Sequence, residues 1–319
     1  MTIAWVFGSS GLLGAALCRA LRSNGTELFF PAERFVWGSE HELSTQIMAA
    51  VQAFASQVGT ADRWEIYWAA GVGTMSSSAD TFAPETRILS LVLRLLESEP
   101  RLMAVSGALA FASSAGAIYA GSSDDIITEN IAPMPTTAYA RAKLGQEDQI
   151  RSFASENNGI AALIARISTL YGPGQNAGKR QGLLSHIARS ILRNQPIQIY
   201  VPYDTIRDYI AADDAAAAMV TALRTASEKS SVLTKIIASE QPVTIAEIVS
   251  IFKRVSRRAP RVVTSASKLS GLYSRRVQFR SIALPECKRS PIRSLPVGIA
   301  QLMMAERSAF AEGPGAEGK

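Results

Sequence analysis

Residues 3–14 read Ile3-Ala-Trp-Val-Phe7 and then Gly8-Ser-Ser-Gly11-Leu-Leu-Gly14, and this stretch decides the fold. Five consecutive apolar residues are typical of a strand buried on both faces. Residues 12, 13, 16, 17, 20 and 21 are apolar and repeat with the spacing of one helix face. The stretch therefore predicts a strand, a tight glycine turn and a helix.

The glycine turn has the spacing Gly-x-x-Gly-x-x-Gly. The first glycine permits the tight turn, the second lets the backbone approach a pyrophosphate, and the third lets helix and strand pack closely. Because the first N–H groups of a helix attract anions, we expect a dinucleotide to be held by Gly8, Ser10, Gly11, Leu12 and Gly14. A strand–helix turn without a ligand is the alternative interpretation.

Apolar runs alternate with amphipathic stretches as far as about residue 172. The predicted strands are 3–7, 28–30, 35–37, 65–69, 108–112 and 161–167, and the predicted helices are 12–21, 43–54, 86–96 and 139–155. This alternation predicts an α/β protein with a doubly wound parallel sheet of the Rossmann type.

The remainder is less regular, with eight prolines from Pro173 to Pro296, and predicts a smaller C-terminal lobe. We assign residues 1–172, with about 205–238 returning to it, to an NAD(P)-binding Rossmann domain. Residues 173–204 and 239–310 are assigned to a substrate-binding lobe. Residues 311–319 are small and polar and predict a disordered tail.

The composition excludes several classes of protein. The 319-residue chain is 47% hydrophobic and 19% charged, so it is not wholly disordered. Its net charge of +6 comes without a dense basic run, so we expect no nucleic-acid partner. Two cysteines and two histidines argue against a metal site and a Ser-His-Asp triad. No signal peptide and no apolar stretch of about 18 residues is found, so we expect a cytoplasmic protein without membrane association.

The residues after the second predicted strand bear on the choice of dinucleotide. An acidic residue about 20 positions along binds the ribose 2′-OH of NAD, whereas an arginine accommodates the 2′-phosphate of NADP. The run here is Pro31-Ala-Glu33-Arg34. Glu33 suits the first role with a shift of one residue, Arg34 suits the second, and a solvated turn is the alternative for both. We favour NADP over NAD.

The segment Tyr139-Ala-Arg-Ala-Lys143 places a phenol and an ammonium group on one helix face. The ammonium is expected to lower the pKa of the phenol, which can then exchange a proton with a carbinol oxygen during hydride transfer. Ser113 and Ser114 end an apolar strand, and ligands bind beyond such strand ends. We therefore predict Ser114, Tyr139 and Lys143 as catalytic. An exposed helix pair and two capping serines are the alternative.

Three other polar residues are predicted to be structural. Arg166 is expected to tie a strand to a helix rather than to contact a ligand. Asp213 and Asp214 are expected to stabilise the start of a helix, where carboxylates are favourable.

Eight short motifs occur in an order that resembles the extended short-chain dehydrogenase/reductase family, which includes epimerases, dehydratases and reductases of nucleotide sugars. The resemblance covers nearly the whole chain. The motifs are Gly8-x-x-Gly11-x-x-Gly14, Ala69-Ala70-Gly71, Ser113-Ser114 before Tyr119, Thr128-Glu129 before Pro135, Tyr139-x-x-x-Lys143, Arg166 with Tyr171-Gly-Pro-Gly174, Arg207-Asp-Tyr-Ile-x-x-Asp213-Asp214-Ala and Ser294-Leu-Pro-x-Gly298-Ile.

The resemblance implies a bound NAD(P) and a substrate that is a nucleoside-diphosphate sugar. It implies further cofactor contacts from Ala69, Ala70, Gly71, Ser113, Tyr139 and Lys143. Pyrophosphate favours guanidinium groups, and the substrate-binding residues that we predict are Asn176, Arg207 and Arg280. A homodimer formed through two helices beside the sheet is also implied.

Three functions share these residues. We favour a 4-ketoreductase, because the preference for NADP fits a cofactor that exchanges. A 4-epimerase with tightly held NAD is the alternative, and a non-catalytic NAD(P)-sensing module is the third. Dehydratases of the family carry Asp-Glu where this chain has Ala115-Gly116-Ala117, which argues against 4,6-dehydration.

Overall fold

The computed structural model describes residues 1–59, 61–71, 73, 77–175, 182–228, 231–258, 260–264, 276–284 and 292–312. Its largest sheet has six parallel strands in the order β2-β1-β3-β4-β5-β9. Their bounds are Thr2–Phe7 (β1), Glu27–Phe29 (β2), Arg63–Trp68 (β3), Ser106–Ser114 (β4), Ile160–Ile167 (β5) and Val232–Ile237 (β9). The strand order reverses between β1 and β3, which is where open sheets of this kind bind ligands.

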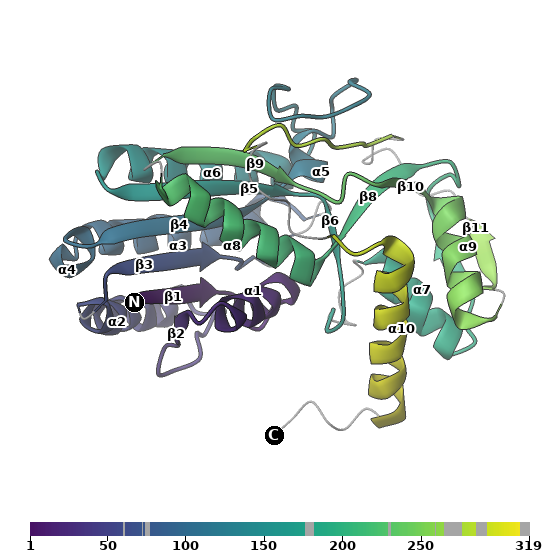
Figure 1. Ribbon diagram of the computed structural model, residues 1–319, viewed down its shortest axis with the longest axis horizontal. Helices are drawn as coiled ribbons and strands as arrows, with labels where there is room; N and C mark the ends of the chain where they lie inside the picture. The colour runs from purple at the N-terminus through teal and green to yellow at the C-terminus, as the bar shows by residue number, and fades with distance from the viewer. Residues whose placement is uncertain are drawn as a thin grey trace.

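Helices cover both faces of this sheet (Figure 1). One face carries α1 and α8, and the other carries α2, α3 and α6. Their bounds are Leu12–Ser23 (α1), Glu40–Val58 (α2), Ala79–Glu97 (α3), Ala138–Glu156 (α6) and Ala212–Glu228 (α8), with the short helices Pro100–Met103 (α4) and Ala115–Ile118 (α5) beside β4. The predicted Rossmann-type fold is confirmed.

The apolar run of β1 is explained by burial on both faces. Ile3, Trp5 and Phe7 belong to the core on the side of α2, α3 and α6. Ala4 and Val6 belong to the core on the side of α1 and α8. Because successive side chains of a strand point to opposite faces, a doubly covered strand has no polar side.

The predicted strand at 35–37 is wrong, since these residues form a loop. The Phe35 ring centroid lies 6.4 Å from that of Trp5 and 6.2 Å from that of Phe7. The backbone N–H of Val36 donates to Gln46 Oε1 at 2.9 Å. The apolar residues therefore anchor a loop to the core and to α2 instead of adding a strand.

Except for α8 and β9, the elements after β5 form a second group at the carboxyl ends of the large sheet (Figure 1). They share a core of their own around α7, α9 and α10. A three-stranded sheet has the order β10-β8-β6, and β11 pairs with β7. The bounds are Thr169–Tyr171 (β6), Leu183–Leu192 (α7), Ile197–Ile199 (β7), Ile206–Ala211 (β8), Pro242–Thr244 (β10), Ile245–Ser256 (α9), Val262–Thr264 (β11) and Leu295–Glu312 (α10).

Between these elements, α8 and β9 return the chain to the large sheet. The division into two lobes stays a prediction. Helix α10 includes residues 311 and 312 of the predicted tail, and residues 313–319 lie outside the described part. In the described ranges, no helix combines the length and the apolar character needed to cross a membrane. Cytoplasmic localisation and assembly as a homodimer stay predictions.

Candidate active site

The glycine turn between β1 and α1 leaves no room for side chains at two positions. Gly8 has a φ of +81°, and a Cβ there would lie 2.8 Å from the Ala70 Cα. A Cβ at Gly14 would lie 2.0 Å from the Gly8 carbonyl oxygen. The loop after β3, which contains Ala69, Ala70 and Gly71, therefore lies directly against the turn.

The start of α1 is suited to an anion. Gly11 is the N-cap residue and has no side chain to accept the first N–H groups, and the first turn has no acidic residue. Ser10 is exposed in the turn, and Leu12 begins the helix. Backbone N–H groups and the helix dipole favour a phosphate at this position. The turn fits the pyrophosphate of a dinucleotide, the ligand predicted for it.

We expect Gly14→Ala to weaken dinucleotide binding by at least about fivefold, because overpacking of this kind costs about 1–3 kcal/mol. The added methyl group would overlap the Gly8 carbonyl and move the turn. Gly145→Ala is a matched control, since Gly145 is also helical and a Cβ there meets nothing within 4 Å. Fluorescence titration with NADPH measures both variants. Equal affinities would contradict the assigned cradle.

Ser114, Tyr139 and Lys143 come together at the carboxyl end of β4. Ser114 ends β4, and it lies close enough to the Tyr139 phenol to lower the pKa of that phenol. Helix α6 begins at Ala138 because the Thr137 side chain accepts the Ala140 N–H at 3.2 Å. This start places Tyr139 in the first turn and Lys143 one turn later.

The two titratable groups have shifted pKa values. Burial raises the pKa of Tyr139 to about 12, the Ser114 hydrogen bond lowers it, and the Glu85 charge raises it. Burial lowers the pKa of Lys143 to about 8, while Glu85 and Glu147 raise it. The predicted lowering of the Tyr139 pKa is therefore wrong. The Lys143 ammonium donates a hydrogen bond to the backbone carbonyl of Ala112, at a distance of 3.3 Å.

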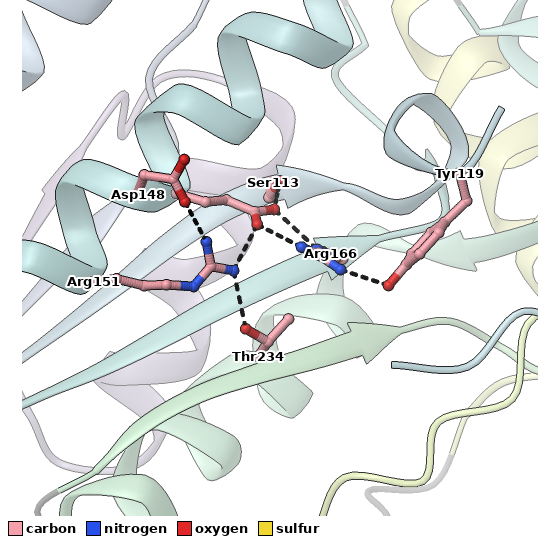
Figure 2. Close-up of polar contacts among 7 residues, drawn as sticks. Ser113, Tyr119, Asp148, Arg151, Arg166 and Thr234 are labelled. Carbon is pink, nitrogen blue, oxygen red and sulfur yellow. Dashed lines mark hydrogen bonds and ion pairs between the residues drawn. The ribbon is translucent and has the colours of Figure 1, made fainter. Parts of the chain in front are cut away.

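An ionic network joins the end of β4 to α6 and β5 (Figure 2). Glu147 is fully buried and accepts hydrogen bonds from Arg166 Nη2 at 2.7 Å and Arg151 Nη2 at 2.9 Å. Arg166 Nη1 donates to the Tyr119 hydroxyl at 2.5 Å. Arg166 thus ties β5 to α6, as predicted. The Ser113 hydroxyl donates to Glu147 Oε1 at 2.6 Å, and its contact with a cofactor stays a prediction.

Glu33 and Arg34 lie in the exposed loop after β2. Gln46 of α2 holds this loop, since its Nε2 donates to the Arg34 carbonyl at 3.4 Å and to Glu33 Oε2 at 3.5 Å. The neighbouring Arg22 guanidinium lies 5.5 Å from the centre of the Phe30 ring. Because β2 is the neighbour of β1, this loop and the glycine turn lie at the same end of the sheet.

Two of the three predicted substrate residues are described. Arg207 lies on β8, and its Nη1 donates to the Ile206 carbonyl at 2.7 Å. Arg280 is exposed, and its backbone N–H donates to the Ile127 carbonyl at 2.9 Å. The segment 276–280 extends from the start of β8 to the loop that contains Ile127, because Arg276 forms a β-bridge with Ile206 and Phe279 forms one with Ile127. Asn176 lies outside the described residues.

The predicted helix start is also present. Asp213 and Asp214 lie in the first turn of α8. Asp214 Oδ1 accepts a hydrogen bond from Arg293 Nε at 3.0 Å, and Asp213 Oδ1 accepts one from Arg19 Nη2 at 2.6 Å. Across the described residues, no group of three or more His, Cys, Asp or Glu side chains could hold a metal ion.

Sequence reasoning missed two acidic residues, Glu85 and Glu147. Glu147 follows Lys143 by four residues and so shares its helix face, a spacing that could have revealed it. Glu85 lies on α3, far from the site in sequence. No local sequence pattern identifies Glu85, because its hydrogen-bond donor Gly73 comes from the loop after β3.

The chain belongs to the NAD-dependent epimerase/dehydratase family, whose sequence model matches residues 4–234. This match confirms the resemblance read from the eight motifs. The chain is also 35% identical over 113 residues to the dTDP-4-dehydro-6-deoxyglucose reductase of Escherichia coli, with 35% of each chain covered. The matched segments span 25% to 39% of the lengths of the curated relatives.

Solved structures are similar over nearly the whole chain. The UDP-glucose 4-epimerase of Thermus thermophilus, in complex with NAD, has a TM-score of 0.78 at 18% identity. The RMD protein of Pseudomonas aeruginosa, complexed with NADPH, has a TM-score of 0.77 at 18% identity. Both similarities cover 97% of this chain and 100% of the other. Neighbours of this fold thus bind either NAD or NADPH.

Proposed function

We propose that this protein is an NADPH-dependent 4-ketoreductase of a nucleoside-diphosphate sugar. The observation that carries the proposal is the convergence of Ser114, at the end of β4, with the Tyr139 phenol of α6, whose pKa Ser114 lowers, and with Lys143 one helical turn away. A ketone oxygen that meets both hydroxyls would be polarised by Ser114 and protonated by Tyr139. Bound NADPH supplies the hydride.

The protonated state of the phenol suits the first step of a reduction. With a pKa of about 12, Tyr139 is a neutral phenol at neutral pH in the ligand-free protein. Reduction of a ketone begins with a protonated donor, whereas epimerisation of an alcohol begins with a base. After the proton has left, the Lys143 ammonium would stabilise the phenolate.

The cofactor preference rests on the loop after β2. Arg34 is exposed in this loop, and Arg22 lies beside Phe30 at the end of β2. An exposed arginine on this loop suits the 2′-phosphate of NADP. Glu33 faces Gln46, which engages one of its carboxylate oxygens. These contacts support NADP over NAD.

The substrate class rests on Arg207, Arg276 and Arg280. Arg207 follows Ile206, which forms a β-bridge with Arg276, so these two arginines lie on neighbouring segments. Arg280 follows Arg276 by four residues. Guanidinium groups recognise pyrophosphate through paired N–H donors. Because the Escherichia coli relative is named for dTDP-4-dehydro-6-deoxyglucose, this compound is the first substrate to test.

The test is an assay of NADPH absorbance with dTDP-, UDP- and GDP-linked 4-keto sugars. We expect one NADPH to be consumed for each sugar reduced. Interconversion of two sugars without added cofactor would instead establish the 4-epimerase alternative. Dinucleotide binding without turnover of any nucleotide sugar would contradict the proposal and favour the NAD(P)-sensing alternative.

The pH dependence follows from Lys143. We expect kcat/KM for reduction to be level below about pH 8 and to fall about tenfold per pH unit above it, because the ammonium is lost with a pKa of about 8. Tyr139 stays protonated over this range. Lys143→Arg keeps a positive charge and should lose this fall, at lower overall activity. A wild-type profile that stays level well beyond this pH would contradict the assignment.

A further inference from the structure

The N-terminal turns of α3 hold the loop that follows β3. Phe82 and Glu85 are three residues apart and so share one face of the helix. The Gly73 N–H donates to Glu85 Oε1 at 3.1 Å. The Phe82 ring fills the space beside Gly73, where a Cβ would lie 1.9 Å from a ring carbon. This face of α3 therefore fixes the loop two residues after Gly71.

The same two side chains face the catalytic pair. The ring centroids of Phe82 and Tyr139 lie 5.7 Å apart, with the rings tilted by 48°. A Cβ at Gly71 would lie 3.6 Å from Glu85 Oε2, so the carboxylate also reaches the edge of the predicted cofactor cradle. Its charge acts on both Tyr139 and Lys143. Glu85 thus connects the loop to the pair.

The charges around Lys143 come from two elements. Its ammonium lies 4.7 Å from the centre of the Phe111 ring and donates to a backbone carbonyl of β4. The acidic groups that act on it are Glu147, from its own helix, and Glu85, from α3. Glu147 also pairs with Arg151 and Arg166, so its charge is shared with two guanidinium groups. Tyr139 is neutral beside them.

We propose that Glu85 is a positioning residue, which fixes the loop after β3 through Gly73 and brings a carboxylate from the edge of the predicted cofactor cradle to the Tyr139 and Lys143 pair. This inference rests on the proposed function of Tyr139 and Lys143. A buried lysine tends to lose its proton, because burial disfavours the charged form. The ammonium is the form that can stabilise a phenolate, so a nearby carboxylate maintains the pair in its working state at neutral pH.

Glu85→Gln separates the charge from the anchor, because the amide oxygen can still accept the Gly73 N–H. We expect the pKa of Lys143 to fall by about half a pH unit to one pH unit, since the ammonium loses a favourable neighbour. NMR titration of ligand-free protein labelled at lysine Cε measures it, with the signal assigned through Lys143→Met. The control is Glu97→Gln, an exposed position at the far end of α3, which should cause no shift.

Glu85→Ala removes both the charge and the acceptor. We expect it to bind NADPH about three- to tenfold more weakly than Glu85→Gln, because the loop is no longer held at Gly73. The descending limb of the pH profile should move to lower pH in Glu85→Gln by the same amount as the Lys143 titration.

An unchanged Lys143 titration in Glu85→Gln would overturn the proposal, as would equal NADPH affinity of the two Glu85 variants. The NMR titration uses neither cofactor nor turnover. A wild-type protein that fails to reduce nucleotide sugars would therefore refute the proposed function, while the coupling between Glu85 and Lys143 would still be measured on its own.

Discussion

Tyr139→Phe is expected to lower kcat for reduction about a thousandfold, the middle of the range for a general acid. The substitution removes the phenol hydroxyl next to Ser114, which is the proposed proton donor. It keeps the ring, so the contact with Phe82 at 5.7 Å between centroids is retained. Single-turnover measurement of NADPH oxidation at saturating substrate reports this step directly.

The controls for Tyr139→Phe separate chemistry from folding. Its NADPH affinity and melting temperature should stay close to those of the wild type. Tyr203→Phe changes an exposed tyrosine between β7 and β8 and should leave kcat unchanged. A kcat for Tyr139→Phe within about tenfold of the wild type would show that another group donates the proton.

Glu147→Gln is expected to lower the free energy of unfolding by about 3–5 kcal/mol, the cost of breaking a buried ion pair. Glu147 is fully buried, and the Arg166 side chain is only 5% exposed. The substitution leaves the Arg166 charge buried without its carboxylate. It also changes Glu147 Oε1, the oxygen that accepts hydrogen bonds from both Arg166 Nε and the Ser113 hydroxyl. Urea denaturation measures the difference.

Asp148→Asn is a close control for Glu147→Gln. Asp148 is the adjacent residue and pairs with the same Arg151 at 2.8 Å, but its side chain is 74% exposed. An exposed pair contributes at most about 1 kcal/mol, so Asp148→Asn should be almost neutral. Equal losses in the two variants would contradict the role assigned to the buried network.

The parts of the fold that could be predicted from sequence are those set by local patterns. The strand, glycine turn and helix at residues 2–23 follow from apolar spacing and from turns that only glycine fits. The strand predicted at 35–37 failed because an apolar run also suits a loop pinned to the core, as Phe35 is against Trp5 and Phe7. The spacing of apolar residues alone does not distinguish a buried strand from a loop that packs on the core.

In the candidate site, too, local patterns could be predicted from the sequence and tertiary contacts could not. The spacing of Tyr139 and Lys143 on one helix and the serine at the end of β4 are visible in sequence. The direction of the Tyr139 pKa was predicted wrongly, because burial and Glu85 act through neighbours that are distant in sequence. Ser113 donates to Glu147, a tertiary contact that strand-end position does not reveal.

The most direct measurement follows the hydride itself. NADPH carrying deuterium at both nicotinamide C4 positions is incubated with the enzyme and a nucleotide-linked 4-keto sugar, and the product is analysed by mass spectrometry and NMR. Direct transfer beside Tyr139 predicts one deuterium per product molecule, located at C4 of the sugar. A reduced product without deuterium, or no reduced product from any nucleotide sugar tested, would contradict the account.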